Sequence, residues 1–362
     1  MTDTEPIMQR KMKISTITQT ALILAATLAI SCGGGSTPVE RTNTEPEPEP
    51  EHHNPVFSLF EGDDSYHVYR NSERLANFPI ENSRRVIDLK SYKNDCFILI
   101  SEGQTQDSAA PQPIPPEIYK NGRKAMTFDP SLKAVAFDMD EGHFYVLGLL
   151  GDNVYTIYRD GLRVMDLAKK QDTKPVDISV FGQTIYTAMQ HGSSVEIFKD
   201  KNRMFSIPGK CKDIQVSLRG VYTLCDDTLY LDNSAIMRNE YYRNADKEMH
   251  AVPKLLAVGN KHMLVGCSSS FDAEHTYCCI FKNQQPMITT SPDEQRIGKS
   301  TMSTKCVGVA ISNETMYYTD IVLTPDFEPA EPLTFRYYTD HDKIFNITFT
   351  NPQTKLLFTT SN

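Results

Sequence analysis

The pattern of hydrophobic and polar positions beyond Pro55 is that of β-strands. Apolar residues alternate with polar ones over short segments, and apolar residues do not recur at the helical spacing of three and four. Asn-Gly, Asp-Gly and similar pairs separate these segments, and such pairs tolerate the positive φ angles of tight hairpin turns. This part of the chain is therefore expected to be all β.

One β-hairpin recurs along the chain. Its first strand ends in an aromatic residue or Leu, a basic or polar residue follows, then Asn or Asp, often with Gly, and then a second strand. The seven copies are Tyr66–Phe78, Glu117–Phe128, Tyr155–Leu167, Val195–Ile207, Thr228–Asn239, Cys278–Thr290 and Phe335–Phe349. A second kind of hairpin, such as VDISVFGQTIYTAM, lies between consecutive copies.

Four strands in each repeat of about 44 residues predict a seven-bladed β-propeller of four-stranded antiparallel blades. Val56–Gly62 is expected to be the second strand of the first blade. The segment KLLFTTSN at the C-terminus would supply the missing first strand and close the ring. Six or eight blades are alternatives because the fifth copy is weak, and a β-sandwich or two smaller barrels are others.

The N-terminal part of the chain predicts an export signal in residues 1–31. Arg10, Lys11 and Lys13 precede the apolar run Ala21–Ile30, which is too short to span a membrane as a helix. The sequence LAISC, followed by GGGS, resembles the lipobox of bacterial lipoproteins. This resemblance implies lipid attachment at Cys32 and a place at the outer membrane of the cell envelope, on the periplasmic or outer side. A plain secretory signal with an incidental Cys is the alternative.

Residues 32–54 form a predicted tether. Their Gly/Ser part is typical of a flexible linker and their alternating Glu-Pro part of an extended one, so they would separate a domain at residues 55–362 from a membrane. His52 and His53 in this segment are expected to be solvated rather than to bind a metal.

The repeated hairpin resembles that of β-propeller lipoproteins of Bacteroidetes, whose blades carry a Y-x-K-N-G hairpin. Here the motif is Tyr119, Lys120, Asn121 and Gly122. The resemblance extends over the signal, the tether and the repeats. Because that family is largely uncharacterised, the resemblance implies a fold and an address, with no catalytic residue and no cofactor.

Composition and motifs exclude several classes of function. With 37 Lys and Arg against 46 Asp and Glu, and no basic block among the repeats, the net charge of −9 argues against a nucleic-acid partner. The absence of Trp excludes the WD-type repeats and the propeller enzymes whose blade motifs contain Trp. Asp138–Gly142 resembles the start of a calcium loop, but its spacing fits a turn better, so no metal is expected.

The long connections predict where a ligand binds. They follow the second or fourth strand of a blade, and in a propeller these connections share one face. They are Gly103–Pro116, Asn239–Pro253, Ser268–His275, Ser291–Thr304 and Val322–Pro332. Tyr241, Tyr242, Arg243 and His250 are the aromatic and basic cluster among them and the candidate ligand-binding residues. Alternatively, these connections merely cover the ends of the blades.

Cysteine positions predict disulfides, since a bacterial envelope is oxidising. Cys211 and Cys225 flank one hairpin turn and are expected to pair, as are Cys267 and either Cys278 or Cys279. Buried thiols are the alternative.

The sequence thus favours a monomeric, lipid-anchored envelope propeller that binds an unknown protein or glycan without catalysis. A glycan-active lyase or hydrolase remains an alternative, because acids from several blades can meet at the channel mouth without forming a linear motif. A purely structural envelope protein is the third hypothesis.

Overall fold

The computed structural model describes residues 54–361, apart from residues 81–83, 103–113, 152–153, 170, 245–246, 271–275, 291–302, 313, 324–327 and 340–341. Its 29 named elements are all β-strands. Among the described residues, no helix could cross a membrane.

The strands form seven separate sheets, which we number as blades from the N-terminus. Blade 1 contains β29 (Lys355–Ser361), β1 (Val56–Glu61), β2 (Ser65–Arg70) and β3 (Glu73–Pro79). Blade 2 contains β4 (Arg84–Tyr92), β5 (Asp95–Glu102), β6 (Glu117–Lys120) and β7 (Arg123–Thr127). Blade 3 contains β8 (Leu132–Asp140), β9 (His143–Leu150), β10 (Val154–Arg159) and β11 (Leu162–Ala168).

The remaining blades follow in chain order. Blade 4 contains β12 (Thr173–Phe181), β13 (Thr184–His191), β14 (Ser194–Lys199) and β15 (Asn202–Pro208). Blade 5 contains β16 (Cys211–Ser217), β17 (Gly220–Cys225), β18 (Thr228–Leu231) and β19 (Ser234–Met237). Blade 6 contains β20 (Glu240–Asn244), β21 (Lys247–Val258), β22 (Met263–Ser270), β23 (Tyr277–Lys282) and β24 (Gln285–Thr290). Blade 7 contains β25 (Ser303–Ser312), β26 (Thr315–Leu323), β27 (Leu333–Thr339) and β28 (Asp342–Phe349).

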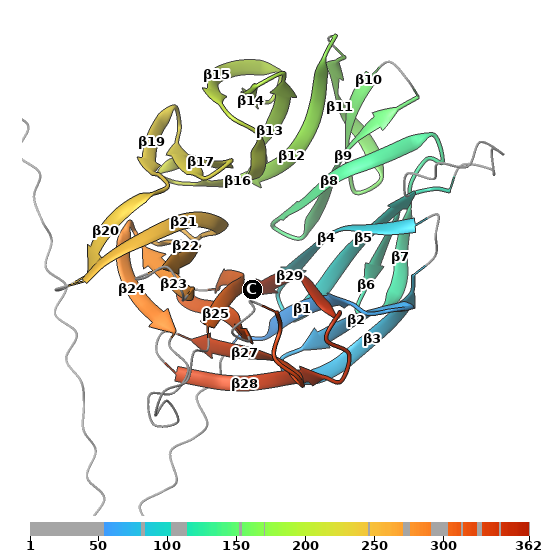
Figure 1. The fold of residues 1–362 in the computed structure, drawn as a ribbon. Coiled ribbons are helices and arrows are strands. Elements are labelled where there is room, and N and C mark those ends of the chain that lie inside the picture. Colours follow the sequence, from blue (N-terminus) through green and yellow to red (C-terminus); the bar gives the residue numbers. More distant parts are fainter. Residues whose placement is uncertain are drawn as a thin grey trace, which may run out of the picture. The chain divides into compact units, whose positions relative to one another are not determined.

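The blades surround a central axis, which confirms the predicted seven-bladed propeller (Figure 1). The predicted ring closure is also confirmed, because β29 at the end of the chain pairs antiparallel with β1, from Val56 opposite Ser361 to Glu61 opposite Lys355. The segment Asn239–Pro253 was expected to be a long connection, and this was wrong. It contains β20 and the first part of β21, which pair as a hairpin and give blade 6 a fifth strand.

The hydrophobic core is divided among the seven spaces between neighbouring blades. Each of seven clusters of buried side chains combines residues of two adjacent blades, for example Leu224 and Leu229 of blade 5 with Met263 and Val265 of blade 6. Each blade therefore buries both faces, which explains why strands such as β5 are apolar over most of their length.

A two-bond clamp recurs at the turn between the third and fourth strands. In blade 2, the Asn121 side chain accepts a hydrogen bond from the backbone N–H of Cys96, at 2.9 Å, and its own N–H donates to the Cys96 carbonyl. Equivalent pairs occur in five further blades: Asn71 with Val56, Asp160 with Phe144, Asp200 with Ile185, Asp232 with Val221 and Asn283 with Met263. All six clamping residues have φ between 47° and 53°. Asn and Asp tolerate this region and carry the needed acceptor, which explains the repeated motif.

The strand register refines the disulfide predictions. Cys211 and Cys225 lie directly opposite each other on β16 and β17, both as thiols in this structure. Cys267 lies opposite Cys279, and the two share one core cluster, whereas Cys278 packs on the other side of the blade. Of the two predicted partners of Cys267, Cys279 is the one that the register favours, and both disulfides stay predictions.

Replacing the clamp residue Asn71 tests the role of the recurring motif. Asn71→Ala removes the acceptor for the Val56 N–H and puts Ala in a left-handed conformation, so it should lower the free energy of unfolding by about 1–2 kcal/mol. Asn71→Asp keeps the acceptor and should change stability little. Urea unfolding of both variants measures this, and equal losses in both would contradict the clamp.

Oxidation of the Cys211–Cys225 pair is tested by mass spectrometry of unreduced protein isolated from an oxidising compartment. The expected product is a disulfide-linked pair of peptides, and its reduction should lower stability by about 3 kcal/mol because the bond closes a short loop. Two alkylatable thiols at these positions would overturn the prediction.

Candidate functional site

A cavity of about 550 Å³ lies on the propeller axis. Its walls are the innermost strands of the seven blades, β29, β4, β8, β12, β16, β21 and β25. This volume lies within the range of small-molecule binding pockets. The exposed side chains of Lys212 and Lys254 are part of its lining, so the cavity opens at the end where the inner strands begin.

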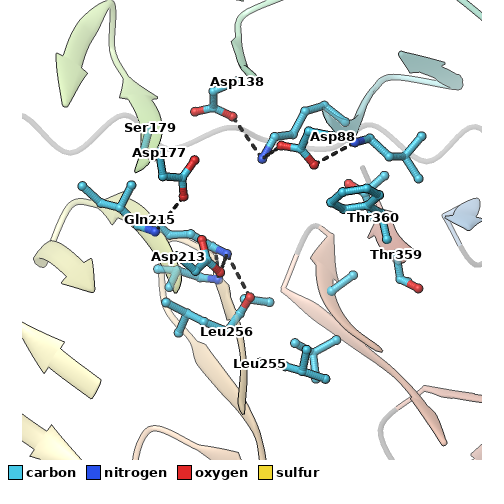
Figure 2. A pocket seen from close by; sticks show the side chains of 18 of the residues that line it. Asp88, Asp138, Asp177, Ser179, Asp213, Gln215, Leu255, Leu256, Thr359 and Thr360 are labelled. Carbon is cyan, nitrogen blue, oxygen red and sulfur yellow. Dashed lines mark hydrogen bonds and ion pairs between the residues drawn. The ribbon is translucent and has the colours of Figure 1, made fainter. Parts of the chain in front are cut away.

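Aspartates from four neighbouring blades project toward this cavity. Asp88, Asp177 and Asp213 each follow a β-bulge in the inner strands β4, β12 and β16, where one residue is left out of the pairing with the second strand. Asp138 comes from β8, two residues beyond the equivalent position. Figure 2 shows the four carboxyl groups on one side of the cavity.

Each inner strand is the edge of its sheet, so it carries N–H groups that no strand of its own blade accepts. Two of the aspartates satisfy such groups of the next blade. Asp138 accepts a hydrogen bond from Val180 N–H at 2.6 Å. Asp177 accepts one from Ile214 N–H at 2.9 Å (Figure 2). Gln215 continues the pattern by accepting from Val258 N–H and donating to the Leu256 carbonyl. These contacts connect blades 3, 4, 5 and 6.

Lys90 of β4 is the cation nearest to these carboxylates. Its Nζ lies 3.0 Å from Asp88 Oδ2 and 3.8 Å from Asp138 Oδ1. Burial lowers the pKa of Lys90, but the four surrounding aspartates outweigh burial and raise this pKa above its usual value. Lys90 therefore stays charged at neutral pH and offsets part of the negative charge.

The aspartates share an excess of negative charge. Burial raises the pKa of Asp88 and Asp138 despite the attraction of Lys90. Burial and the neighbouring Asp213 raise the pKa of Asp177 well above its usual value, and burial raises that of Asp213 to about 6. Like charges in one site cannot all ionise at the usual pH, so Asp177 and Asp213 together retain a proton further into the neutral range.

The cavity wall is polar on one side and mostly apolar on the other. Blades 2 to 5 supply the aspartates, Lys90, Ser179 and Gln215. Blades 6 and 7 supply mainly Leu255, Leu256, Ala257 and the Val307–Ile311 segment, and β29 adds Phe358 and Thr360 (Figure 2). Such a wall can bind a ligand that has both a polar and an apolar part.

The chemistry of the cavity is that of carboxylates, ammonium groups and amides. Its lining contains neither His nor Cys, so Asp and Lys are the titratable side chains there. Among the described residues, no group of three His, Cys, Asp or Glu side chains is arranged to bind a metal ion.

The predicted ligand-binding residues lie away from this cavity, on blade 6. Tyr241 is 74% exposed on β20, and its ring lies 5.0 Å from that of His250, which is opposite it on β21. Tyr242 and Arg243 continue β20, opposite Met249 and Glu248. Pairing thus joins the two strand segments that carry the predicted residues, and their role in binding stays a prediction. Cys32, His52 and His53 lie outside the described residues.

The cavity aspartates were missed by the sequence analysis. A signal for three of them was present, because Asp recurs before Leu or Ile in the otherwise apolar segments VIDLK, VDISV and KDIQV, one in each of three blades. Asp138 was assigned to a turn, and this was wrong for that residue. It lies within β8, and the turn begins only after Asp140.

No protein-family model matches the chain, and no curated protein is detectably similar to it in sequence. Solved propeller structures are similar in fold. The periplasmic gluconolactonase PpgL of Pseudomonas aeruginosa has 10% identity and a TM-score of 0.47, over 84% of this chain and 99% of that one. AztD of Citrobacter koseri has 9% identity and a TM-score of 0.41, over 85% and 97%. BamB of Moraxella catarrhalis has 9% identity and a TM-score of 0.41, over 83% and 84%.

The cavity aspartates make stability depend on pH. A carboxyl group with a raised pKa in the folded state stabilises the protein below its unfolded pKa, and this contribution is lost as pH rises through the folded pKa of about 6 for Asp213. Asp213→Asn should therefore raise the thermal midpoint at about pH 7.5 and leave it unchanged near pH 4.

Asp95→Asn is the matched contrast, because Lys120 lowers the pKa of Asp95. This variant should lower the midpoint at neutral pH. Calorimetry at both pH values measures the two effects, and a lower midpoint for Asp213→Asn at neutral pH would contradict the analysis.

Proposed function

We propose that the protein is a binding module of the bacterial cell envelope and that its ligand contacts the propeller face at which the axial cavity opens. The observation that carries this proposal is the amphipathic cavity, which opens among the connections that follow the second and fourth strands. Long connections on a rigid scaffold are common binding sites. The signal sequence and Cys32 support an envelope location with a lipid anchor, as does the resemblance to lipoproteins of Bacteroidetes.

Hydrogen bonding within the cavity favours binding over catalysis. Asp138 and Asp177 accept backbone N–H groups of neighbouring blades, and Asp88 is paired with Lys90. These contacts give three of the four carboxylates a structural role. A glycan-active hydrolase or lyase is the second candidate, because four carboxylates from four blades converge and the pKa values of Asp177 and Asp213 are raised, as general acids require.

Capture from detergent-solubilised envelope tests the proposed face. The full-length protein should retain an identifiable protein or glycan, and alanine at Tyr241, Tyr242 and Arg243 should reduce retention about tenfold or more. Leu218→Ala is the control, because Leu218 is 77% exposed in the β16–β17 turn at the opposite end of the propeller.

Equal retention by all three proteins would reject Tyr241, Tyr242 and Arg243 as the binding site. Release of new reducing ends or unsaturated sugars from a captured glycan by the wild-type protein would favour the enzyme over the binding module.

A further inference from the structure

A basic residue recurs at one position of the inner strands. The position lies two residues before the residue that the β-bulge leaves unpaired. Six of the seven inner strands have Lys or Arg there, within the strand or, for Lys210, directly before it: Arg85, Lys133, Lys174, Lys210, Lys305 and Lys355. All six side chains are exposed.

These residues meet at one end of the axis. Six of the inner strands begin after the outermost strand of the preceding blade, and β21 begins after the extra strand β20. All seven end at the turn into their own second strand or pair antiparallel with it, so they run in the same direction around the cavity. Neighbouring inner strands are in contact all the way round. The recurring position therefore forms a ring at the end where the strands begin, which is the face of the proposed function (Figure 1).

The seventh inner strand, β21, contributes a cation at its bulge, two residues after the recurring position. β21 has Val252 at the recurring position, and its unpaired bulge residue is the exposed Lys254. Lys212 occupies the same bulge position in β16, and Asp227 pairs with both lysines, at 2.7 Å from Lys254 and 3.4 Å from Lys212. For Lys133, Lys174 and Lys305, no ion pair with another described residue is present.

Protection of a strand edge does not explain this ring. Lysines on exposed edge strands prevent pairing with other molecules, but the inner edges face a closed axis that no other sheet can approach. The outermost strands are the accessible edges, and they carry exposed basic residues of their own, such as Arg163 of β11 and Arg203 of β15. The protein as a whole has a net charge of −9, yet positive charges gather in this ring.

We propose that this ring, which we call the cationic rim, binds an anionic polysaccharide that carries carboxylate or sulfate groups. The inference rests on the proposed function and specifies its ligand. Five of the six recurring residues are Lys, whose compact charge attracts anions without the planar, bidentate geometry of Arg. The carboxylates of the cavity lie three or more residues deeper along the strands, about 10 Å from the rim, so a polyanion would lie across the rim without entering the cavity.

Other polyanionic partners fit this face less well. A protein partner needs apolar anchors at the centre of its interface. Single-stranded nucleic acids need aromatic surfaces for stacking. Among the described residues, Tyr241 on β20 is the one large, exposed hydrophobic side chain at this end of the propeller.

The chain enters the propeller at the opposite end. Val56 begins β1 beside the turn residue Asn71, and Ser361 at the end of β29 donates a hydrogen bond to the Pro55 carbonyl. The predicted tether therefore joins the face remote from the cationic rim.

Dextran sulfate and dextran form the test pair, since they share a backbone and differ in charge. The full-length protein should bind immobilised dextran sulfate at low ionic strength, lose this binding as salt is raised, and not bind dextran. Reversing three rim charges, with Lys133→Glu, Lys174→Glu and Lys305→Glu together, should weaken binding about tenfold or more.

The matched control reverses three exposed charges at the other end, with Lys93→Glu, Lys201→Glu and Lys261→Glu. It has the same net charge as the rim variant and should bind like the wild type. Thermal unfolding shows whether charge reversal disturbs folding. If it does, a third variant with Lys133→Gln, Lys174→Gln and Lys305→Gln removes the three charges without reversing them and should also weaken binding.

Three results would overturn the inference. One is failure of the wild-type protein to bind dextran sulfate at low salt, and another is equal weakening in the rim and control variants. The third is tighter, rim-dependent binding of polyglutamate or single-stranded DNA, which would replace the polysaccharide by another polyanion. Retention of an uncharged envelope ligand that depends on Tyr241 but not on the rim would leave the proposed function standing and reject an anionic ligand.

Discussion

The whole structure depends on the need of every blade to bury both of its faces. Seven clusters of apolar side chains lie between neighbouring blades, so each blade is stable only with a neighbour on either side. An open row of blades would leave two apolar faces in water, and closure of the ring removes both. The pairing of β29 with β1 is therefore the contact on which the other interfaces rely. It places Leu356 in the core between blades 7 and 1, and Leu357 and Phe358 in the core between blades 1 and 2.

The clamp and the inner-strand bulge give the repeat its two fixed points. At the clamp, the side chain and the backbone N–H of one Asn or Asp bind the first or second residue of the second strand, so the turn fixes the register of two strand pairs. The bulge shifts the register of the inner strand, and the residue after it is Asp in β4, β12 and β16.

Much of the fold was predictable from the sequence because it repeats. The alternation of apolar residues and the Asn/Asp turns appear in each blade, and the unpaired strands at both ends of the chain indicate closure. The extra strand β20 was not predictable, because Tyr241 and Tyr242 pair with a polar segment that has no alternating pattern of its own. The axial site was harder still. Its four aspartates meet only because the blades form a ring. Successive members of the set Asp88, Asp138, Asp177 and Asp213 are 36 to 50 residues apart in sequence. The same holds for the cationic rim, since no two of its recurring residues are neighbours in the sequence.

The two ends of the described chain, Pro55 and Ser361, are bound to each other on one face. A short peptide could therefore join them, and new ends could be opened in a connection between two other blades, where the outermost strand of one leads into the innermost strand of the next. In such a circular permutant, β29, β1, β2 and β3 of blade 1 would follow one another directly along the chain. The chain would begin and end at the opposite face of the propeller. The propeller would be unchanged, and its chain ends would lie on the face at which the axial cavity opens.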